Sequence, residues 1–280
     1  MLIRIIGTGA MGIGIAHVFA AAGHSVEVAD LTVETAEAGV NRLAVQLDRQ
    51  VEKGRLTEAE KSRLLGQIRV VSEDDDVSET DLLLEAVSET TALKRAIFEA
   101  YDTRCKGDCI FATNTSSLSI TELAAGLSHA GRFLGMHFFN PPPVMKLVEV
   151  ISGEETSAET VSEIAALCEQ LGKTPVTCRE APGFIVNRLL IPMLNEACNL
   201  LEEQVAGRDD IDAAMKLGAN HPMGPLALAD LIGLDICLNI METLFLETGD
   251  PKFRPSVLLR KMVRAGKLGR KTKRGFYDYG

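Results

Sequence analysis

The segment Leu2–Gly23, LIRIIGTGAMGIGIAHVFAAAG, joins an apolar run, a glycine-rich turn and an alanine-rich stretch. The run Leu2–Ile6 predicts a buried parallel strand, interrupted only by Arg4. The stretch Ile13–Ala22 contains no proline and predicts a helix that ends at Gly23. A strand, a G-x-G-x-x-G turn and a helix in this order are typical of a dinucleotide-binding loop.

Each glycine of this turn, GTGAMG, has a separate expected role. Gly7 lets the chain turn tightly from the strand, and Gly9 lets the backbone approach a pyrophosphate. Gly12 lets the helix pack closely against the strand, while the N–H groups of the first helical turn face the phosphates. The residues expected to contact the cofactor here are Gly7, Gly9, Ala10, Met11 and Gly12.

An acidic residue follows the next predicted strand. The strand is Ser25–Ala29, and Asp30 stands at its end, about 20 residues beyond the glycine turn, where a carboxylate can accept both ribose hydroxyls of NAD. Asp30 could instead cap the helix that begins near Thr32 or Val33. No arginine follows directly to pair with a 2′-phosphate, so the sequence favours NAD over NADP.

The composition excludes several classes of protein. The 280 residues carry a formal charge of −10, from 29 basic and 39 acidic side chains, so we expect no nucleic-acid partner. No apolar run reaches the ~18 residues of a membrane span, and a strand is predicted from residue 2, so we expect neither a transmembrane helix nor a signal peptide. The six cysteines show no C-x-x-C pair and no metal-ligand spacing, so we expect reduced thiols, no metal site and a cytoplasmic protein.

Strands and helices alternate as far as residue 180, and beyond it no segment predicts a strand. This alternation predicts a Rossmann-type α/β fold, with a doubly wound, mostly parallel sheet covered by helices on both faces. We expect an NAD-binding domain at residues 1–180 and an all-helical C-terminal domain at residues 181–280. The helices expected in the second domain are Phe184–Glu203, Asp209–Leu217, Leu226–Leu246 and Ser256–Ala265.

One histidine and one carboxylate form a candidate acid–base pair. His137 follows the predicted strand Phe133–Met136, and Glu149 lies inside the apolar strand Lys146–Ile151. A carboxylate is costly to bury without a partner, and a histidine at the same sheet edge would supply one. In such a pair the carboxylate holds one ring nitrogen while the other exchanges a proton with substrate. The alternative is a surface glutamate beside a structural histidine.

A polar turn, Asn114–Ser117, follows the predicted strand Cys109–Thr113. Ligands bind at the carboxyl edge of an open α/β sheet, which makes Ser116 a candidate contact. The same residues could instead cap the short helix predicted at Ser119–Leu127. The other histidines are expected to be structural, and His129 is expected to be exposed.

Motifs along almost the whole chain resemble those of the 3-hydroxyacyl-CoA dehydrogenase family in its short, monofunctional form. The glycine turn alone is weakly specific, whereas the proline-containing motifs in the middle and C-terminal parts of the chain are far more specific. The resembling stretches are GTGAMGIGIA (7–16), Asp30, EAVSE (85–89), NTSSLSIT (114–121), HFFNPPPVMKLVEV (137–150), APGFIVNRLL (181–190), HPMGPLALADLIGLD (221–235) and GRKTKRGFYDY (269–279).

The resemblance implies an NAD-dependent oxidoreductase that interconverts (S)-3-hydroxyacyl-CoA, in particular 3-hydroxybutyryl-CoA, and 3-oxoacyl-CoA. It implies that His137 is the acid–base residue, with Glu149 as its orienting partner. Ser116 and Asn187 would hydrogen-bond the reacting oxygen, and the C-terminal domain would form a homodimer interface and complete the substrate site. The further NAD contacts that it implies are Glu89, Lys94, Ser116, Asn140 and Lys271.

The same resemblance implies a coenzyme A contact at Lys53, on the long helix predicted at Thr35–Lys53. This lysine belongs to a basic stripe on an acidic protein, although such a stripe could also be a solvated helix face. Gln46 departs from the small polar residue that the family often has near this position, which changes the expected contacts with coenzyme A. The residues of the stripe are Arg42, Arg49, Lys53 and Arg55.

Two other functions are compatible with these motifs. An enzyme for a free 3-hydroxy acid or sugar acid would share them, although Lys53 and Arg55 favour a coenzyme A thioester. A non-catalytic, NAD-binding structural protein would keep the fold without needing the catalytic candidates. Their joint presence favours an enzyme; they are Ser116, His137, Glu149 and Asn187.

Overall fold

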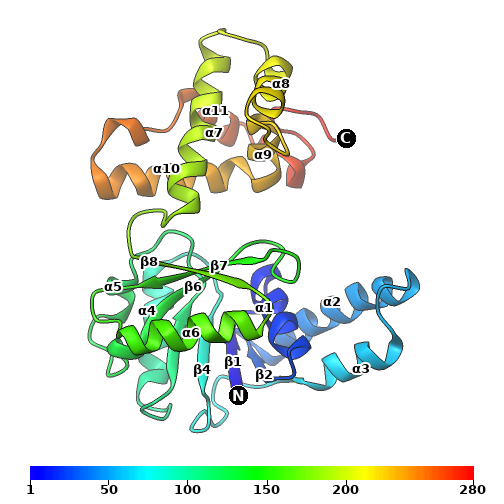
Figure 1. Cartoon of the computed structure of the whole chain (residues 1–280), viewed down its shortest axis with the longest axis vertical. Coiled ribbons are helices and arrows are strands. Elements are labelled where there is room, and N and C mark those ends of the chain that lie inside the picture. Colours follow the sequence, from blue (N-terminus) through cyan, green and yellow to red (C-terminus); the bar gives the residue numbers. More distant parts are fainter. The chain divides into compact units, whose positions relative to one another are not determined.

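The computed structural model describes all residues from 1 to 280, and the chain divides into two compact units, Met1–Glu180 and Ala181–Gly280. The first unit is built around one sheet, whose strands are β1 (Leu2–Ile6), β2 (Ser25–Ala29), β3 (Ile68–Val70), β4 (Leu82–Glu85), β5 (Ile110–Thr113), β6 (Phe133–Phe138), β7 (Leu147–Ser152) and β8 (Thr174–Arg179). Their order across the sheet is β3-β2-β1-β4-β5-β6-β7-β8 (Figure 1). The second unit is helical, so the predicted fold class is confirmed.

Adjacent strands of the sheet run parallel except at one place. β6 and β7 are antiparallel, so β7 and β8 run against the other six strands. The central strands are buried on both faces: Ile3, Ile5, Leu83 and Leu84 expose none of their surface. Continuous apolar runs predict this burial on both faces. Because these strands run parallel, their carboxyl ends lie along the same edge of the sheet.

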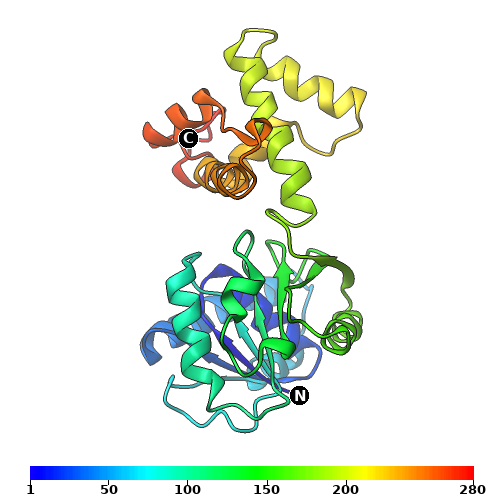
Figure 2. The same cartoon turned by 90° about the vertical axis from the view of Figure 1, so that its left-hand side faces the viewer.

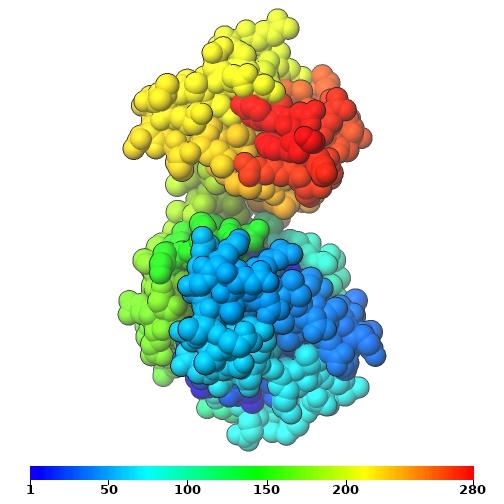
Figure 3. All heavy atoms as spheres, turned by 90° about the vertical axis from the view of Figure 1, so that its right-hand side faces the viewer, coloured from blue at the N-terminus to red at the C-terminus, as the bar shows by residue number.

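Helices cover both faces of this sheet. Those of the first unit are α1 (Ala10–Ala21), α2 (Val33–Glu52), α3 (Glu58–Gly66), α4 (Thr91–Asp102), α5 (Ile120–Ala124) and α6 (Ala158–Gln170), with a 3₁₀ turn at Ala130–Arg132. In Figure 2, α4 and α6 lie on opposite sides of the strands. The hairpin of α2 and α3 forms much of the surface of this unit in Figure 3, and α3 begins with the predicted capping box of Thr57 and Glu60.

The second unit has its own apolar core, which includes Ile191, Leu234 and Met241. Its helices are α7 (Val186–Glu202), α8 (Arg208–Gly218), α9 (Pro225–Ile232), α10 (Leu234–Thr248) and α11 (Val257–Arg264), with 3₁₀ turns at Pro251–Phe253 and Arg270–Thr272. The prediction of a single helix over Leu226–Leu246 is wrong, because the helix is interrupted at Gly233. There φ is 109°, which only glycine adopts readily, and the segment becomes α9 and α10.

A buried carboxylate holds the C-terminal segment against this helical core. Asp230 accepts hydrogen bonds from the backbone N–H groups of Phe276 and Tyr277, both at 2.9 Å. A Cβ on Gly275 would lie only 1.9 Å from Asp230 Oδ1, so this close approach requires glycine. The segment, red in Figure 3, is thereby fixed on the surface of the second unit. None of the helices in either unit has both the length and the apolar character needed to cross a lipid bilayer.

Candidate active site

The glycine turn between β1 and α1 is shaped by close backbone contacts. Gly7 has a φ of 97°, and a Cβ there would lie 2.8 Å from the carbonyl oxygen of Ala86. A Cβ on Gly12 would lie 1.9 Å from the carbonyl oxygen of Gly7, so α1 can begin here only if this residue is glycine. Gly9 differs from both, because no protein atom lies within 4 Å of a Cβ built on it. Nothing within the protein explains this third glycine, whereas a cradle for a bound pyrophosphate does.

The N-terminus of α1 has donors suited to an anion. The first hydrogen bond within the helix runs from the N–H of Ile13 to the carbonyl oxygen of Gly9. No side chain caps this end, and its first turn contains no acidic residue. The N–H groups of Ala10, Met11 and Gly12 therefore precede the regular hydrogen-bonding pattern, where the helix dipole favours a negative charge.

Asp30 follows β2 and lies beside this turn. Its Oδ2 accepts hydrogen bonds from the N–H and Oγ1 of Thr8, each at 2.7 Å, and its Oδ1 accepts one from the N–H of Leu31. Burial opposes ionisation of Asp30, but these hydrogen bonds outweigh it and lower its pKa. A carboxylate has about four acceptor positions, and these three hydrogen bonds leave one for a ribose hydroxyl. Thr32, not Asp30, caps α2, which removes the alternative role for this aspartate.

A cleft of about 230 Å³ opens at the carboxyl ends of β1, β2 and β4. It contains both the glycine turn and Asp30, together with apolar side chains from the start of α4. A slot that is apolar along its walls and polar at a few points is typical of cofactor sites. Its lining residues include Gly7, Gly9, Asp30, Leu31, Val87 and Leu93.

Arg42 does not act as part of a solvated basic stripe. Its Nη2 donates a hydrogen bond to the carbonyl oxygen of Thr8 at 2.8 Å and thus braces the glycine turn from α2. The charge of Arg42 also contributes to the lowered pKa of Asp30. Gln46 on α2 and Lys53, which directly follows this helix, are both exposed.

His137 and Glu149 lie directly opposite each other on β6 and β7. Residues in this position share one face of an antiparallel pair, and His137 Nδ1 lies 2.8 Å from Glu149 Oε2. Both side chains are buried, with 5% and 1% of their residue surfaces exposed. An ionised carboxylate can only accept a hydrogen bond, so Nδ1 carries the proton in a neutral ring and Nε2 carries the lone pair. The ring of Phe139 packs against the imidazole at 4.5 Å.

The loop between these two strands is held by a buried lysine. Lys173 Nζ donates hydrogen bonds to the carbonyl oxygens of Pro142 and Met145, at 2.6 and 2.9 Å. It precedes β8 and so ties the proline-rich loop to the neighbouring strand. Asn140, a predicted cofactor contact, is exposed in this loop. The fixed loop maintains the register that places the histidine opposite its carboxylate.

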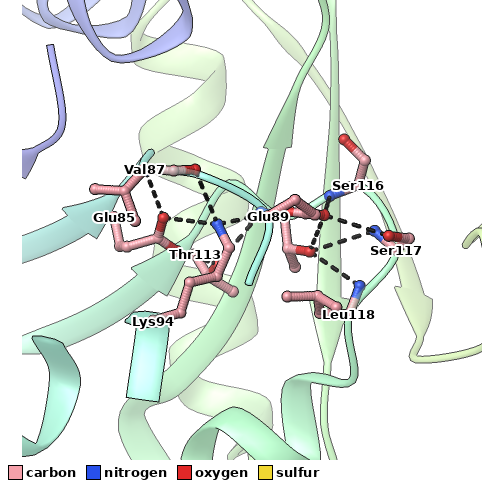
Figure 4. Close-up of polar contacts among 9 residues, drawn as sticks. Glu85, Val87, Glu89, Lys94, Thr113, Ser116, Ser117 and Leu118 are labelled. Atoms are coloured by element: carbon pink, nitrogen blue, oxygen red, sulfur yellow. Dashed lines mark hydrogen bonds and ion pairs between the residues drawn. The ribbon is translucent and has the colours of Figure 1, made fainter. Parts of the chain in front are cut away.

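A second set of charges lies at the ends of β4 and β5 (Figure 4). Glu85 Oε1 lies 2.7 Å from Lys94 Nζ, and its Oε2 accepts a hydrogen bond from Thr113 Oγ1 at 2.7 Å. Neither Glu85 nor Lys94 is more than 1% exposed. Burial raises the pKa of Glu85, although the charge of Lys94 and several hydrogen bonds act in the opposite direction. The lysine also lies 3.2 Å from Glu89 Oε2, so one buried cation serves two carboxylates.

Glu89 connects this cluster to the turn that contains Ser116. Its Oε1 accepts hydrogen bonds from Thr115 Oγ1 at 2.5 Å, the N–H of Ser116 at 2.8 Å and Ser117 Oγ at 3.3 Å, and most of these are visible in Figure 4. Burial opposes ionisation of Glu89, yet Lys94 and these donors lower its pKa. An ionised Glu89 therefore fixes the Ser116 turn at the carboxyl edge of the sheet.

Sequence reasoning missed Glu85 and Asn114 as parts of this site. Asn114 Oδ1 accepts a hydrogen bond from the N–H of Phe138 at 2.8 Å and so joins the end of β5 to the end of β6. The signal for Glu85 was present: it is a carboxylate that ends an otherwise apolar strand, and like Glu149 inside β7 it requires a partner if it is buried. Lys94, nine residues later on α4, is that partner.

Two predicted site residues belong to the second unit. Asn187 lies in the first turn of α7 and is buried. Lys271 lies in the last 3₁₀ turn, and its Nζ is paired with Asp235 Oδ2 at 2.5 Å. In the first unit, the prediction that His129 is exposed is wrong. It is 4% exposed, because Asp102 and the carbonyl oxygen of Lys106 bind its ring nitrogens.

Both units match family models. Residues 2–181 match the NAD-binding domain of 3-hydroxyacyl-CoA dehydrogenase, and residues 183–279 match the C-terminal domain of the same family. A probable 3-hydroxybutyryl-CoA dehydrogenase of Bacillus subtilis is 51% identical, over 99% of this chain and 96% of its own length. A 3-hydroxybutyryl-CoA dehydrogenase of Clostridioides difficile is 49% identical, over 100% of this chain and 99% of its own.

A solved structure has the same fold throughout. The crystal structure of (S)-3-hydroxybutyryl-CoA dehydrogenase from Ralstonia eutropha is 50% identical, covers 100% of this chain and 99% of its own, and superposes with a TM-score of 0.95. The matches cover both units, and the glycine turn and the cleft beside it fit NAD. The chain therefore belongs to the 3-hydroxyacyl-CoA dehydrogenase family, and it is an NAD-dependent oxidoreductase that interconverts 3-hydroxyacyl-CoA and 3-oxoacyl-CoA.

Proposed function

We propose that the principal substrate is a short-chain thioester, 3-hydroxybutyryl-CoA, and that His137 and Glu149 perform the acid–base chemistry. The observation that supports the chemical assignment is the buried hydrogen bond between these two side chains, at 2.8 Å. It lies toward the carboxyl end of β6, the edge that also bears the glycine turn after β1. The names of the relatives from Clostridioides difficile and Ralstonia eutropha support the chain length.

In the oxidative direction, the Nε2 atom of neutral His137 accepts the proton of the 3-hydroxyl group. Glu149 remains ionised, holds the ring tautomer through Nδ1 and stabilises the imidazolium that forms. Ser116 and Asn187 hydrogen-bond the same oxygen as its charge changes. NAD, when bound, supplies the hydride acceptor. In the reductive direction the imidazolium of His137 returns its proton to that oxygen.

The residues proposed to hold the cofactor begin with the glycine turn. The N–H groups of Ala10, Met11 and Gly12 bind the pyrophosphate, and Asp30 binds the adenosine ribose. Glu89 and Lys94 act chiefly by fixing the turn that bears Ser116, because their charges are used within the cluster described above. The remaining proposed contacts, taken from the family motifs, are Asn140 and Lys271.

We expect a preference for NADH over NADPH of about tenfold or more in kcat/KM. A 2′-phosphate would face the carboxylate of Asp30 and would leave its ribose hydrogen bonds unmade, and an unsatisfied polar group costs about 1–3 kcal/mol. Initial rates with the two cofactors measure the ratio. Asp30→Asn removes the charge while keeping the shape of the side chain, and it should lower the ratio of kcat/KM with NADH to kcat/KM with NADPH. Equal or better efficiency of the original enzyme with NADPH would contradict the assignment.

We also propose that α2 binds coenzyme A. A shallow hollow of about 510 Å³ runs along this helix and is lined by Arg42, Gln46 and Arg49, with Lys53 one turn further on. Arginine and lysine side chains beside an open groove suit the phosphates of coenzyme A. Gln46, exposed in the hollow, offers an amide in place of the small polar residue typical of the family.

Lys53→Ala should raise the KM for 3-hydroxybutyryl-CoA by about fivefold, the upper end for one exposed charge pair. The KM for the corresponding pantetheine thioester, which lacks the nucleotide phosphates, should barely change. Arg63→Ala removes an exposed charge from the same helical hairpin and provides the control. If Lys53→Ala weakens both thioesters equally, this lysine is only part of a solvated helix face.

The substrate is tested by a panel of 3-hydroxyacyl-CoA esters of increasing chain length, read by NADH absorbance. We expect the highest kcat/KM with the four-carbon ester and a much lower value with free 3-hydroxybutyrate. Faster turnover of a free 3-hydroxy acid or sugar acid would favour the alternative substrate class. A maximum at a longer acyl chain would leave the family assignment intact but would contradict the four-carbon proposal.

We further propose a cytoplasmic homodimer that associates through the helical C-terminal unit. This unit exposes large apolar side chains, and contiguous patches of such residues commonly mark interfaces. Light scattering after gel filtration at micromolar concentration should give a dimer mass, and a monomer mass would contradict the proposal. The exposed apolar side chains include Leu189, Leu231, Ile236, Phe245 and Leu246.

A further inference from the structure

The cleft that contains the glycine turn and Asp30 has a second carboxylate on its wall. Glu73 follows β3 and lines this cleft, although neither the sequence motifs nor the contacts described above assign it a role. We propose that Glu73 accepts a hydrogen bond from the exocyclic amino group of the adenine of NAD, and that it thereby selects adenine over a base with an oxygen at that position. This inference rests on the proposed placement of the adenosine ribose at Asp30.

The walls of the cleft near Asp30 suit a flat base. Leu31 directly follows Asp30, while Leu93 and Ile97 lie one turn apart on the same face of α4, and all three line the cleft. Apolar walls with a few polar groups are typical of sites for aromatic ligands. Adenine is attached to the ribose that Asp30 is proposed to bind, so the base would occupy this apolar part of the cleft. Glu73 is then the polar group on its wall.

The other carboxylates of the turn after β3 have partners within the turn. Asp75 Oδ2 accepts a hydrogen bond from the N–H of Ser72 at 3.0 Å. Asp76 accepts hydrogen bonds from the N–H and Oγ of Ser78, each at 3.0 Å. The carboxylate of Glu73 accepts no hydrogen bond from the protein and lines the cleft instead. Its acceptor positions are therefore available to a ligand.

A buried arginine fixes the backbone of this turn. Arg4 on β1 exposes none of its surface, and its Nη2 donates a hydrogen bond to the carbonyl oxygen of Asp76 at 2.8 Å. Its Nη1 donates a longer one, 3.5 Å, to the carbonyl oxygen of Ser72, which belongs to the peptide group that joins Ser72 to Glu73. A residue whose backbone is already ordered loses less conformational entropy when its side chain binds a ligand.

The charge of Glu73 acts on the same part of α4 that forms the apolar wall. Burial raises the pKa of Tyr101, and the negative charge of Glu73 acts in the same direction. Tyr101 lies one helical turn beyond Ile97, which lines the cleft. The carboxylate and the apolar wall therefore belong to the same end of the cleft.

The proposed contact is selective because of which partner donates the hydrogen bond. An ionised carboxylate only accepts hydrogen bonds, and the exocyclic amino group of adenine donates them. Hypoxanthine has a carbonyl oxygen in place of this amino group, so it would present an acceptor to an acceptor. The amide of a glutamine can both donate and accept, so Glu73→Gln would hydrogen-bond either base.

The test compares NADH with reduced nicotinamide hypoxanthine dinucleotide, which differs from NADH only in the base. Titration of the full-length enzyme, followed by the fluorescence of the reduced nicotinamide, gives both dissociation constants. We expect the hypoxanthine analogue to bind about threefold to tenfold more weakly, the range of one net hydrogen bond. This comparison uses the unaltered protein, so it does not depend on the folding of a variant. Equal dissociation constants would overturn the proposal.

Two variants assign the selectivity to one side chain. Glu73→Gln should bring the two dissociation constants to within about twofold of each other, because the amide serves both bases. Asp74→Asn removes the same charge from the next residue, which is exposed and does not line the cleft, and it should leave their ratio unchanged. No change in the ratio for Glu73→Gln, or the same change in both variants, would contradict the assignment of Glu73.

Asp30→Asn separates this inference from the proposed placement of NAD. If Asp30→Asn lowers the preference for NADH over NADPH while Glu73→Gln leaves the base ratio unchanged, the ribose placement holds and only the role of Glu73 is wrong. If neither variant changes its ratio, the cleft does not bind the adenosine, and both assignments are wrong.

Discussion

Glu149→Gln is expected to lower turnover by about 10²–10⁴-fold, the usual contribution of positioned acid–base catalysis. Glutamine keeps the size of the side chain but removes the charge that stabilises the imidazolium of His137. Its amide can also donate, which lets the ring adopt the wrong tautomer. NADH affinity, measured by fluorescence titration, should barely change because the proposed cofactor contacts lie elsewhere. An intact NADH affinity also shows that the variant is folded.

The pairing itself is tested with a double variant. His137→Gln should lose at least as much turnover as Glu149→Gln, because it removes the group that transfers the proton. The two losses should not multiply in the double variant, since Glu149 has no catalytic task once the imidazole is absent. Single-turnover rates of the three variants give the comparison. Multiplicative losses, or near-normal turnover of Glu149→Gln, would show that the two residues do not act as one unit.

Lys94→Met should lower the free energy of unfolding by about 3–5 kcal/mol, as expected when one member of a buried charge pair is removed. Methionine fills a similar volume, so the main effect is electrostatic: Glu85 loses its cation, and Glu89 loses one of its partners. Urea titration followed by circular dichroism measures the change. Arg95→Met removes a charge from the next residue of α4, which is more than one-third exposed, and should cost less than about 1 kcal/mol.

The effect of Lys94→Met should depend on pH. Burial already raises the pKa of Glu85, and loss of the lysine removes the main influence that lowers it. A carboxyl group with a raised folded-state pKa contributes stability in acid and loses that contribution as the pH rises through this pKa. The deficit should therefore be smaller near about pH 5 than near about pH 8. A deficit that is equal at both values would show that the cost comes from packing rather than from the uncompensated carboxylate.

The parts of the fold that the sequence predicts are those encoded in short segments. The strand, glycine turn and α1 follow from local chemistry, and the capping box of Thr57 and Glu60 marks the start of α3. The break at Gly233 was missed because the apolar pattern continues across it, and a single glycine within a helical pattern does not reveal its φ. His129 was misjudged because its partner Asp102 is distant in sequence and the turn around it looks polar.

In the candidate site, too, the residues with a local sequence signal were predicted, and those that depend on tertiary packing were not. Glu149 interrupts an apolar strand, so the sequence indicates that it needs a partner. His137 is the histidine expected at the same edge of the sheet. The double use of Lys94 by two carboxylates could not be inferred, because it depends on how α4 packs beside β4 and β5. Arg42 looked like part of a solvated stripe, and only the three-dimensional path of α2 brings it to the carbonyl oxygen of Thr8.

The antiparallel step between β6 and β7 constrains how this enzyme can evolve. Glu149 faces His137 only in the observed register, and its neighbours Val148 and Val150 point into the apolar core. Inserting or deleting one residue within β7 would exchange the two faces, which places a valine at the histidine and a carboxylate in the core. Functional variants, whether natural homologues or selected from laboratory libraries, should therefore carry substitutions in β7 but no insertions or deletions. Changes in chain length should accumulate instead at exposed positions such as Gly54, in the connection between α2 and α3.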